Sequence, residues 1–230
     1  MPFYIKAAMT AWILLIGLPL ILGLIAQMRV SSAFNHWKSV PVSSGVTGAQ
    51  AAQMILRAAG IRDVEVVPIR DMLGDHYDPY NKRLCLSPEV YNTASVAAVG
   101  IAAHEVGHAI QDAKKYAPLQ ARMALVPITM FASQLLWPIF IASAFFQISQ
   151  LMTLALICFV VLTIFQLITL PVEFDASRRA KIILSQMGMV RSGMEAQGVN
   201  SVLNAAALTY VAAFIASLGN LIYFLLSRRE

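Results

Sequence analysis

The sequence predicts an α-helical integral membrane protein with about four transmembrane helices and a small α+β domain. Its 230 residues are 58% hydrophobic and 13% charged, whereas soluble domains average about 25% charged residues. Several uncharged stretches are each long enough to cross a hydrocarbon core of roughly 30 Å as a helix. Between these stretches lie two polar regions, and the first of them mixes helical and β-type patterns.

The first predicted membrane helix covers residues 7–28, which carry no charge and are rich in Leu and Ile. Gly17-Leu18-Pro19 interrupts this run and is expected to kink the helix, which transmembrane helices tolerate. The run exceeds the core of about 7–15 residues of a signal peptide and lacks a small-x-small cleavage site. We therefore expect a retained anchor.

Residues 29–122 form the first polar region, which is expected to form one domain together with residues 171–204. Residues 47–57 have the pattern of a short amphipathic helix, with Thr47 as its N-cap. Residues 92–113 are rich in Ala and helical in pattern. Their apolar run is too short for a membrane span, so a buried core helix is expected.

Two β-type segments of this region predict a hairpin or small sheet. Residues 64–69 are expected to form an edge strand, because Pro68 has no N–H to donate. Residues 75–81 have strong turn chemistry, and residues 82–87 then alternate as a second strand.

The remaining apolar stretches predict three further membrane helices. Residues 123–170 contain no charge and are long enough for a hairpin of helices at 123–146 and 151–170, with a polar turn near 147–150. Charged residues return in the segment 171–204. Residues 205–226 are the fourth predicted membrane helix.

The distribution of Lys and Arg predicts which side of the membrane carries the polar regions. Cytoplasmic loops carry the excess of positive charge, so the polar regions and the site within them are expected on the cytoplasmic side. Three basic residues are expected on the opposite side, contrary to this rule: Lys6, Arg228 and Arg229. Nine basic residues flank the helices on the predicted cytoplasmic side: Arg29, Lys38, Lys114, Lys115, Arg122, Arg178, Arg179, Lys181 and Arg191.

Composition also excludes two other classes of site. The net charge of +5 does not indicate nucleic-acid binding, because no run of Lys and Arg is interleaved with aromatic residues. Cys85 and Cys158 lie in different settings and lack a Cys-x-x-Cys spacing, so neither a disulfide between them nor a zinc ribbon is expected.

Residues 104–108 read His-Glu-Val-Gly-His, an H-E-x-x-H pattern. His104 and His108 lie one turn apart on one face of a helix, so both imidazoles can reach a single metal ion. Glu105 is placed to act on a water that zinc activates rather than to bind the metal. The pattern indicates a zinc peptidase, and the alternative is a helix that contains these three residues by chance.

A catalytic zinc site needs three protein ligands and an open position for water. Residues 109–116 contain no histidine, so the third ligand must come from elsewhere in the chain. Glu173 stands out because it directly follows a predicted membrane helix, although a carboxylate there can also be an ordinary solvated residue. The candidates on the predicted side are His36, His76, Asp112, Glu173, Asp175 and Glu195.

Several stretches, in order over most of the chain, resemble the YugP-type family of bacterial membrane zinc metallopeptidases. The resemblance implies a zincin-like catalytic domain in the bacterial cytoplasmic membrane, of the gluzincin type and distantly similar to the HtpX and CAAX-protease membrane peptidases. It is carried by the stretches Gly74–Pro79, Leu86–Tyr91, His104–Gln111, Pro171–Ser177 and Val202–Val211.

The resemblance also implies one Zn²⁺ per chain with Glu173 as its third ligand. In the distant relatives a Glu-x-x-x-Asp motif supplies this ligand and an Asp that supports a ligand histidine. Here Ser177 stands four residues after Glu173, and an Asp lies at position 175. Either Asp175 or Ser177 is therefore a candidate for the supporting role.

These patterns together predict a zinc-dependent endopeptidase that acts on a peptide or membrane-protein substrate at the lipid bilayer. Glu105 is the expected general base, and the strand at 82–87 is expected to accept an extended substrate along its edge. The oligomeric state is not predicted. The candidate donors to the developing oxyanion are His76, Tyr77, Arg178 and Arg179.

Two alternatives stay open at this level. A site-2-type intramembrane protease also uses H-E-x-x-H, but its Leu-Asp-Gly motif is absent here. A non-enzymatic membrane scaffold with a structural zinc site would instead use a closed set of four ligands.

Overall fold

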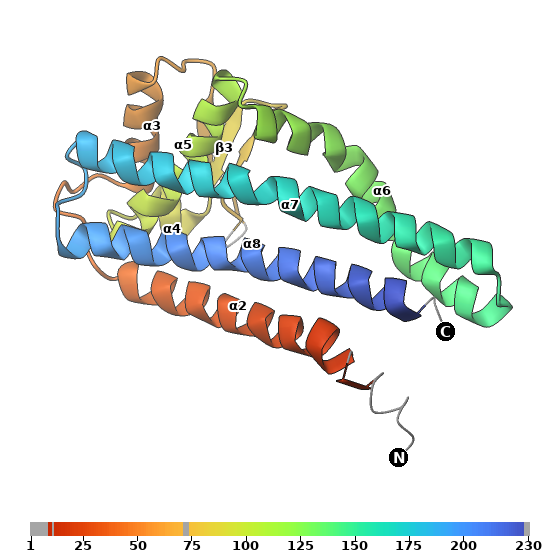
Figure 1. Cartoon of the computed structure of the whole chain (residues 1–230). Helices are drawn as coiled ribbons and strands as arrows, with labels where there is room; N and C mark the ends of the chain where they lie inside the picture. Colours follow the sequence, from red (N-terminus) through yellow and green to blue (C-terminus); the bar gives the residue numbers. More distant parts are fainter. Residues whose placement is uncertain (1–8, 11, 71–73, 228–230) are drawn as a thin grey trace. The chain divides into compact units, whose positions relative to one another are not determined.

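The computed structural model describes residues 9, 10, 12–70 and 74–227. Four of its helices are long and apolar enough to cross a membrane, which confirms the predicted fold class (Figure 1). Residues 7, 8 and 11 of the first predicted span, and the basic residues Lys6, Arg228 and Arg229, lie outside the described residues. The four long helices are α2 (Leu18–Trp37), α6 (Ala117–Phe146), α7 (Ser149–Gln186) and α8 (Met194–Ser227).

The chain divides into two compact units. The first, here called the membrane unit, comprises residues 1–27, 120–170 and 209–230. The second, here called the polar unit, comprises residues 28–119 and 171–208. Each long helix continues from one unit into the other.

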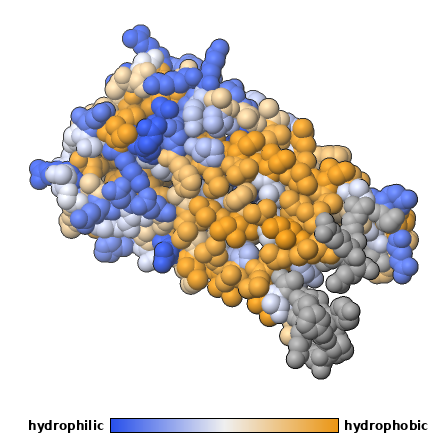
Figure 2. All heavy atoms as spheres, in the orientation of Figure 1, coloured by the Kyte–Doolittle hydropathy of each residue, from blue (hydrophilic) through white to orange (hydrophobic). Residues whose placement is uncertain are grey.

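Exposed apolar side chains characterise the membrane unit, as a lipid environment requires. Phe131, Trp137 and Phe145 are 66%, 65% and 82% exposed, and Figure 2 shows hydrophobic residues gathered over the long helices. A small core includes Phe159, which stacks on Phe224 with 4.6 Å between ring centroids. Such exposure would be unfavourable in water and is favourable against lipid chains.

The first membrane helix includes a π-helical turn, η1 (Ile13–Gly17), which continues directly into α2 at Leu18. The kink expected at Gly17-Leu18-Pro19 stays a prediction. The predicted turn between the second and third membrane helices is present, because α6 ends at Phe146 and α7 begins at Ser149. Gln147 between them has a positive φ of 53°, the left-handed conformation that reverses a chain after a helix.

The described residues of the polar unit form three further helices and a three-stranded sheet. The helices are α3 (Gly48–Ala58), α4 (Pro88–Tyr91) and α5 (Val96–Ala113). The strands β1 (Glu65–Pro68), β2 (His76–Asp78) and β3 (Arg83–Leu86) lie in the order β1-β3-β2, with β1 parallel and β2 antiparallel to β3.

This strand order corrects one prediction. The strand at 82–87 was expected to offer a free edge, but β3 is the central strand and uses both of its edges for β1 and β2. The strand with Pro68 is at an edge, as predicted. The free edges therefore belong to β1 and β2.

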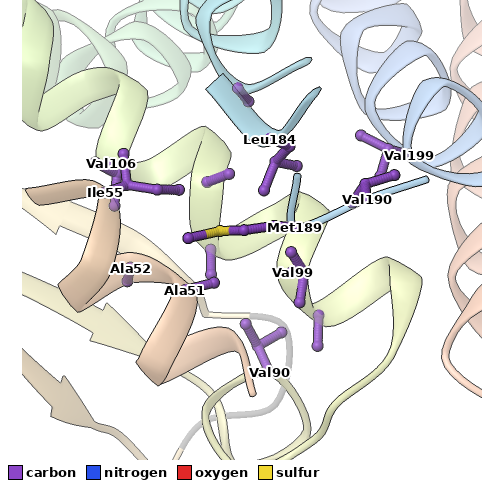
Figure 3. Close-up of a cluster of buried hydrophobic side chains, with 14 of the residues drawn as sticks. Ala51, Ala52, Ile55, Val90, Val99, Val106, Leu184, Met189, Val190 and Val199 are labelled. Atoms are coloured by element: carbon purple, nitrogen blue, oxygen red, sulfur yellow. The ribbon is translucent and has the colours of Figure 1, made fainter. Parts of the chain in front are cut away.

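The apolar core of the polar unit lies between α3, α5 and the segments of α7 and α8 that belong to this unit. Figure 3 shows Ile55 of α3, Val106 of α5, Leu184 of α7 and Val199 of α8 around Met189. The predicted cap of α3 is confirmed: Gln50 N donates to Thr47 Oγ1, and Thr47 N donates to Gln50 Oε1. The core fixes α5, which carries the H-E-x-x-H pattern, against α7.

Two helix boundaries differ from prediction. Helix α5 begins at Val96 rather than Asn92, because residues 93–95 use their backbones to pair with residues 41–48 instead. Helix α7 continues through Pro171, which was expected to start a separate segment. A proline inside a helix removes one backbone hydrogen bond without necessarily ending the helix.

Candidate metal centre and active site

Three buried side chains from α5 and α7 converge on one point in the polar unit. Nε2 of His104 lies 3.2 Å from Oε2 of Glu173, and Nε2 of His108 lies 3.5 Å from the same oxygen. The potential ligand atoms of the three residues all lie within 4.8 Å of one another. Glu173 is only 2% exposed, so it is not the solvated boundary carboxylate that the sequence left open.

A glycine makes this convergence possible. A Cβ atom on Gly107 would lie 2.8 Å from the carbonyl oxygen of Ala176, which is closer than real Cβ atoms come to such atoms. Since Gly107 stands directly before His108, and Ala176 lies three residues after Glu173, the backbones of α5 and α7 approach closely beside the candidate ligands. The Gly of the H-E-x-x-H pattern thus has a packing role.

Each histidine uses its second ring nitrogen for a separate partner. His104 Nδ1 lies 3.1 Å from Ser177 Oγ, and His108 Nδ1 lies 3.0 Å from Gln111 Oε1. A side-chain amide oxygen only accepts hydrogen bonds, so Nδ1 of His108 must carry the proton. Its Nε2 lone pair is then directed towards Glu173 and is available to a metal ion.

Gln111 is fully buried and its orientation is fixed by two further hydrogen bonds. Its Nε2 donates to the carbonyl oxygen of Val172 at 2.8 Å and to Oδ2 of Asp175 at 2.9 Å. Arg178 and Arg179 both bond the Asp175 carboxylate. A chain of contacts therefore runs from His108 through Gln111 to Asp175.

This geometry distinguishes the two residues that were candidates for supporting a ligand histidine. Ser177 contacts His104 directly, whereas Asp175 reaches His108 only through Gln111. Gln111 itself was not predicted. A signal existed, because Gln111 lies three residues after His108 and therefore on the same face of the helix.

Glu105 lies on α5 beside the ligand histidines, and the edge strand β2 contacts it. The backbone N–H of Tyr77 donates to Oε2 of Glu105 at 3.1 Å. Burial raises the pKa of the Glu105 carboxyl above its ordinary value, while nearby His104 and His108 act in the opposite direction. A carboxyl with a raised pKa, next to a potential metal position, is suited to accept and return a proton.

Strand β2 is tied to α5 by a second contact about two turns further along the helix. The phenol of Tyr77 donates to Oδ2 of Asp112 at 2.8 Å, and Lys82 Nζ lies 2.6 Å from the same oxygen. Burial and the hydrogen bond to Asp112 raise the pKa of the Tyr77 phenol well above its ordinary value. The phenol thus stays protonated and keeps the strand in place.

The other candidates named from the sequence lie in other surroundings. His76 is exposed, and its Nδ1 lies 2.7 Å from the carbonyl oxygen of Gly74. Glu195 accepts hydrogen bonds from Ser43. His36 lines a separate groove with Arg29.

The donor set fits zinc. Two imidazole nitrogens and one carboxylate oxygen are a known ligand set of catalytic zinc sites, in which a fourth position stays open. Among the residues that the structure describes, this group comprises three ligand residues. Both cysteines are free, one in each unit, so no thiolate joins it.

Comparison with known proteins agrees with this chemistry. The sequence model of the family described as "Putative neutral zinc metallopeptidase" matches residues 12–229. The chain is also 45% identical over 201 residues to "Putative membrane protease YugP" of Bacillus subtilis (strain 168), which covers 87% of this chain and 89% of that protein. No solved structure matches this chain significantly. The chain therefore belongs to this family of zinc metallopeptidases, as the resemblance predicted.

Proposed function

We propose that this integral membrane protein is a zinc-dependent endopeptidase of the gluzincin type. The observation that carries the proposal is the convergence of His104, His108 and Glu173 with Glu105 buried beside them. His104 and His108 would bind zinc through Nε2, and Glu173 through its carboxylate. When bound, zinc supplies a Lewis acid that polarises a peptide carbonyl and lowers the pKa of a coordinated water.

Glu105 acts as general base and then as general acid. Its carboxylate takes a proton from the attacking water and returns it to the departing amine, so that the peptide bond is hydrolysed with one water consumed. The Tyr77 N–H holds this carboxylate in place before substrate arrives. Burial of the site excludes bulk water that would compete with the reacting one.

An extended peptide is the substrate form that the sheet supports. Tyr77 directs its N–H towards Glu105, and β2 pairs with only one neighbour in the described sheet. A peptide or a segment of a membrane protein that pairs along β2 would therefore lie next to Glu105. We therefore propose that the substrate pairs with β2 instead of with the central strand β3.

Two features favour a catalytic over a structural zinc site. The ligand group has three members among the described residues, which leaves one position for water. A proton-accepting carboxylate lies next to it and is not needed as a ligand.

All four residues belong to the polar unit, which favours cleavage outside the hydrocarbon core over intramembrane cleavage of the site-2 type. By the distribution of basic residues, we place this unit on the cytoplasmic side of a bacterial cytoplasmic membrane.

The test is peptide hydrolysis by the full-length protein in detergent or nanodiscs, with zinc measured on the same samples. We expect about one zinc per chain, hydrolysis of unfolded polypeptide, loss of both on chelation, and recovery of both when zinc is returned. His108→Ala is expected to lack both. A wild-type protein that holds zinc and cleaves none of a broad set of peptides would favour the scaffold alternative.

A further inference from the structure

A polar groove separate from the metal centre lies between the parts of α2 and α8 that belong to the polar unit. Its volume is about 440 Å³, and its walls include Arg29, Ser32 and His36 from α2 and Ser201, Asn204 and Leu208 from α8. On each helix the spacing is i, i+3 and i+7, so that one face of each helix forms one wall. We call it the α2–α8 groove.

The two helices are side by side at this level (Figure 1). A Cβ atom on Gly198 of α8 would lie 2.5 Å from the ring of Trp37 of α2. Phe34 of α2 and Val202 of α8 belong to the same apolar core. The groove is therefore a fixed feature of the polar unit rather than a gap between mobile surfaces.

The groove carries positive charge that no carboxylate compensates. The guanidinium of Arg29 has no hydrogen bond or ion pair with any described residue. Lys181 of α7 is not part of the lining but lies beside it, because it donates to Oδ1 of Asn204 at 2.7 Å. It has no carboxylate partner within the described part of the chain. No Asp or Glu lines the groove. By contrast, the pocket beside Arg178 and Arg179 has its charge offset by Asp175.

The polar groups of the groove match a phosphate group. Arg29 and the hydroxyls of Ser32 and Ser201 line the groove and can donate to phosphate oxygens, and the His36 ring adds a further donor. Lys181, beside Asn204, supplies a second cation next to the groove. A phosphate diester carries one negative charge, which two uncompensated cations can attract without a carboxylate to repel it. Leu208 offers an apolar contact at one end of the groove.

The position of the groove in the sequence favours a lipid over a soluble anion. Arg29 directly follows the apolar run of α2, where Leu24 and Met28 are 58% and 62% exposed. Leu208 directly precedes the part of α8 that belongs to the membrane unit. On both helices the groove thus lies where apolar sequence gives way to polar sequence, which is the level of the phosphates at the edge of a hydrocarbon core.

We propose that the α2–α8 groove binds the phosphate of an anionic phospholipid, with Arg29 and Lys181 as its charged contacts. Bound lipid would hold the polar unit at the membrane surface, close to substrates that are themselves membrane-associated. This proposal does not depend on the peptidase activity.

The test compares retention of phosphatidylglycerol and phosphatidylcholine by the purified full-length protein, using native mass spectrometry with equal amounts of the two lipids. We expect wild type to retain phosphatidylglycerol preferentially, by about fivefold for each contributing cation. The double variant Arg29→Gln/Lys181→Gln should lose this preference. The matched control Arg57→Gln/Arg62→Gln removes two exposed cations outside the groove and should keep it.

Three outcomes would overturn the proposal. Equal loss in both double variants would mean that lipids respond to overall charge rather than to the groove. Unchanged preference in Arg29→Gln/Lys181→Gln would place the lipid elsewhere. Displacement of phosphatidylglycerol by inorganic phosphate at millimolar concentration would show that the groove takes a soluble anion. Circular dichroism and zinc content, expected to match wild type, verify that the variants are folded.

Discussion

Helix α5 is held on two sides in different ways. On the side of α7, α5 makes a close backbone approach at Gly107 and several buried polar contacts. Ser177 contacts His104, Gln111 donates to Val172 and Asp175, and Glu173 faces both ligand histidines. On the side of β2, one strand of three residues contributes one backbone N–H to Glu105 and one phenol to Asp112. From this difference we expect the α7 contact to set metal affinity and the β2 contact to set the alignment of the proposed base.

The largest expected effect follows from Glu173→Ala. We expect loss of zinc and of hydrolysis together, because the site keeps only two ligands and two imidazoles alone bind zinc weakly. Zinc by mass spectrometry and peptide cleavage are measured on one preparation. Glu65→Ala, which removes an exposed carboxylate on β1, is the control and should behave as wild type. Full zinc content in Glu173→Ala would remove Glu173 from the ligand set.

Gln111→Leu should weaken zinc binding while leaving all three ligands present. The substitution leaves His108 Nδ1–H and Asp175 without their buried partner, and losing such support reduces metal affinity by about 10–100-fold. Competition with a chelator measures the affinity, and Gln53→Leu on the exposed face of α3 serves as control. An affinity equal to that of wild type would show that Gln111 has only a packing role.

Tyr77→Phe should affect the contact between β2 and α5. Without the phenol, β2 loses its bond to Asp112, so that the Tyr77 N–H no longer fixes Glu105. We expect kcat/KM to fall by about tenfold, since a hydrogen bond to a charged carboxylate contributes at least about 1.5 kcal/mol, with zinc affinity unchanged. Tyr80→Phe, at an exposed position that is 72% accessible, is the control. A loss of zinc affinity in Tyr77→Phe would contradict the division between the two sides.

A smaller effect is expected in the pH profile. Glu105 must be ionised to accept a proton, and its pKa is raised above the ordinary value of 4.5 by burial. The rate should therefore fall as pH falls through a value above 4.5, while activity is retained on the alkaline side of that value. Zinc content measured at each pH separates protonation of Glu105 from metal loss. An acid limb at or below 4.5 with zinc still bound would argue against this base.

Local patterns predicted the elements well, because they depend on spacing within one segment. The helix that places His104 and His108 together, the cap at Thr47 and the turn after Phe146 all follow from such spacing. Glu173 stood out among several carboxylates by its position after a membrane helix. Its role as third ligand was implied by the resemblance to a family, since 65 residues separate it from His108 and no local rule connects them. The sequence could thus predict where the helices lie along the chain.

What the sequence did not reveal depends on tertiary contacts. Gln111 acquires its role only because the carbonyl of Val172 and the Asp175 carboxylate face it from another helix. Tyr77 contributes its backbone N–H to Glu105, and a backbone group carries no sequence signal. The central position of β3 depends on its parallel pairing with β1, although β2 lies between these two strands in the sequence. Single-sequence patterns do not encode these pairings.

The central claim is that Glu105 does the proton transfer and the other three residues hold the metal. The most direct measurement is zinc content and peptide hydrolysis of Glu105→Gln, an isosteric change that keeps the side chain but removes its basicity. We predict wild-type zinc content and a rate lower by about 10²–10⁴-fold. A Glu105→Gln protein that holds zinc and still cleaves peptide at the wild-type rate would contradict the account.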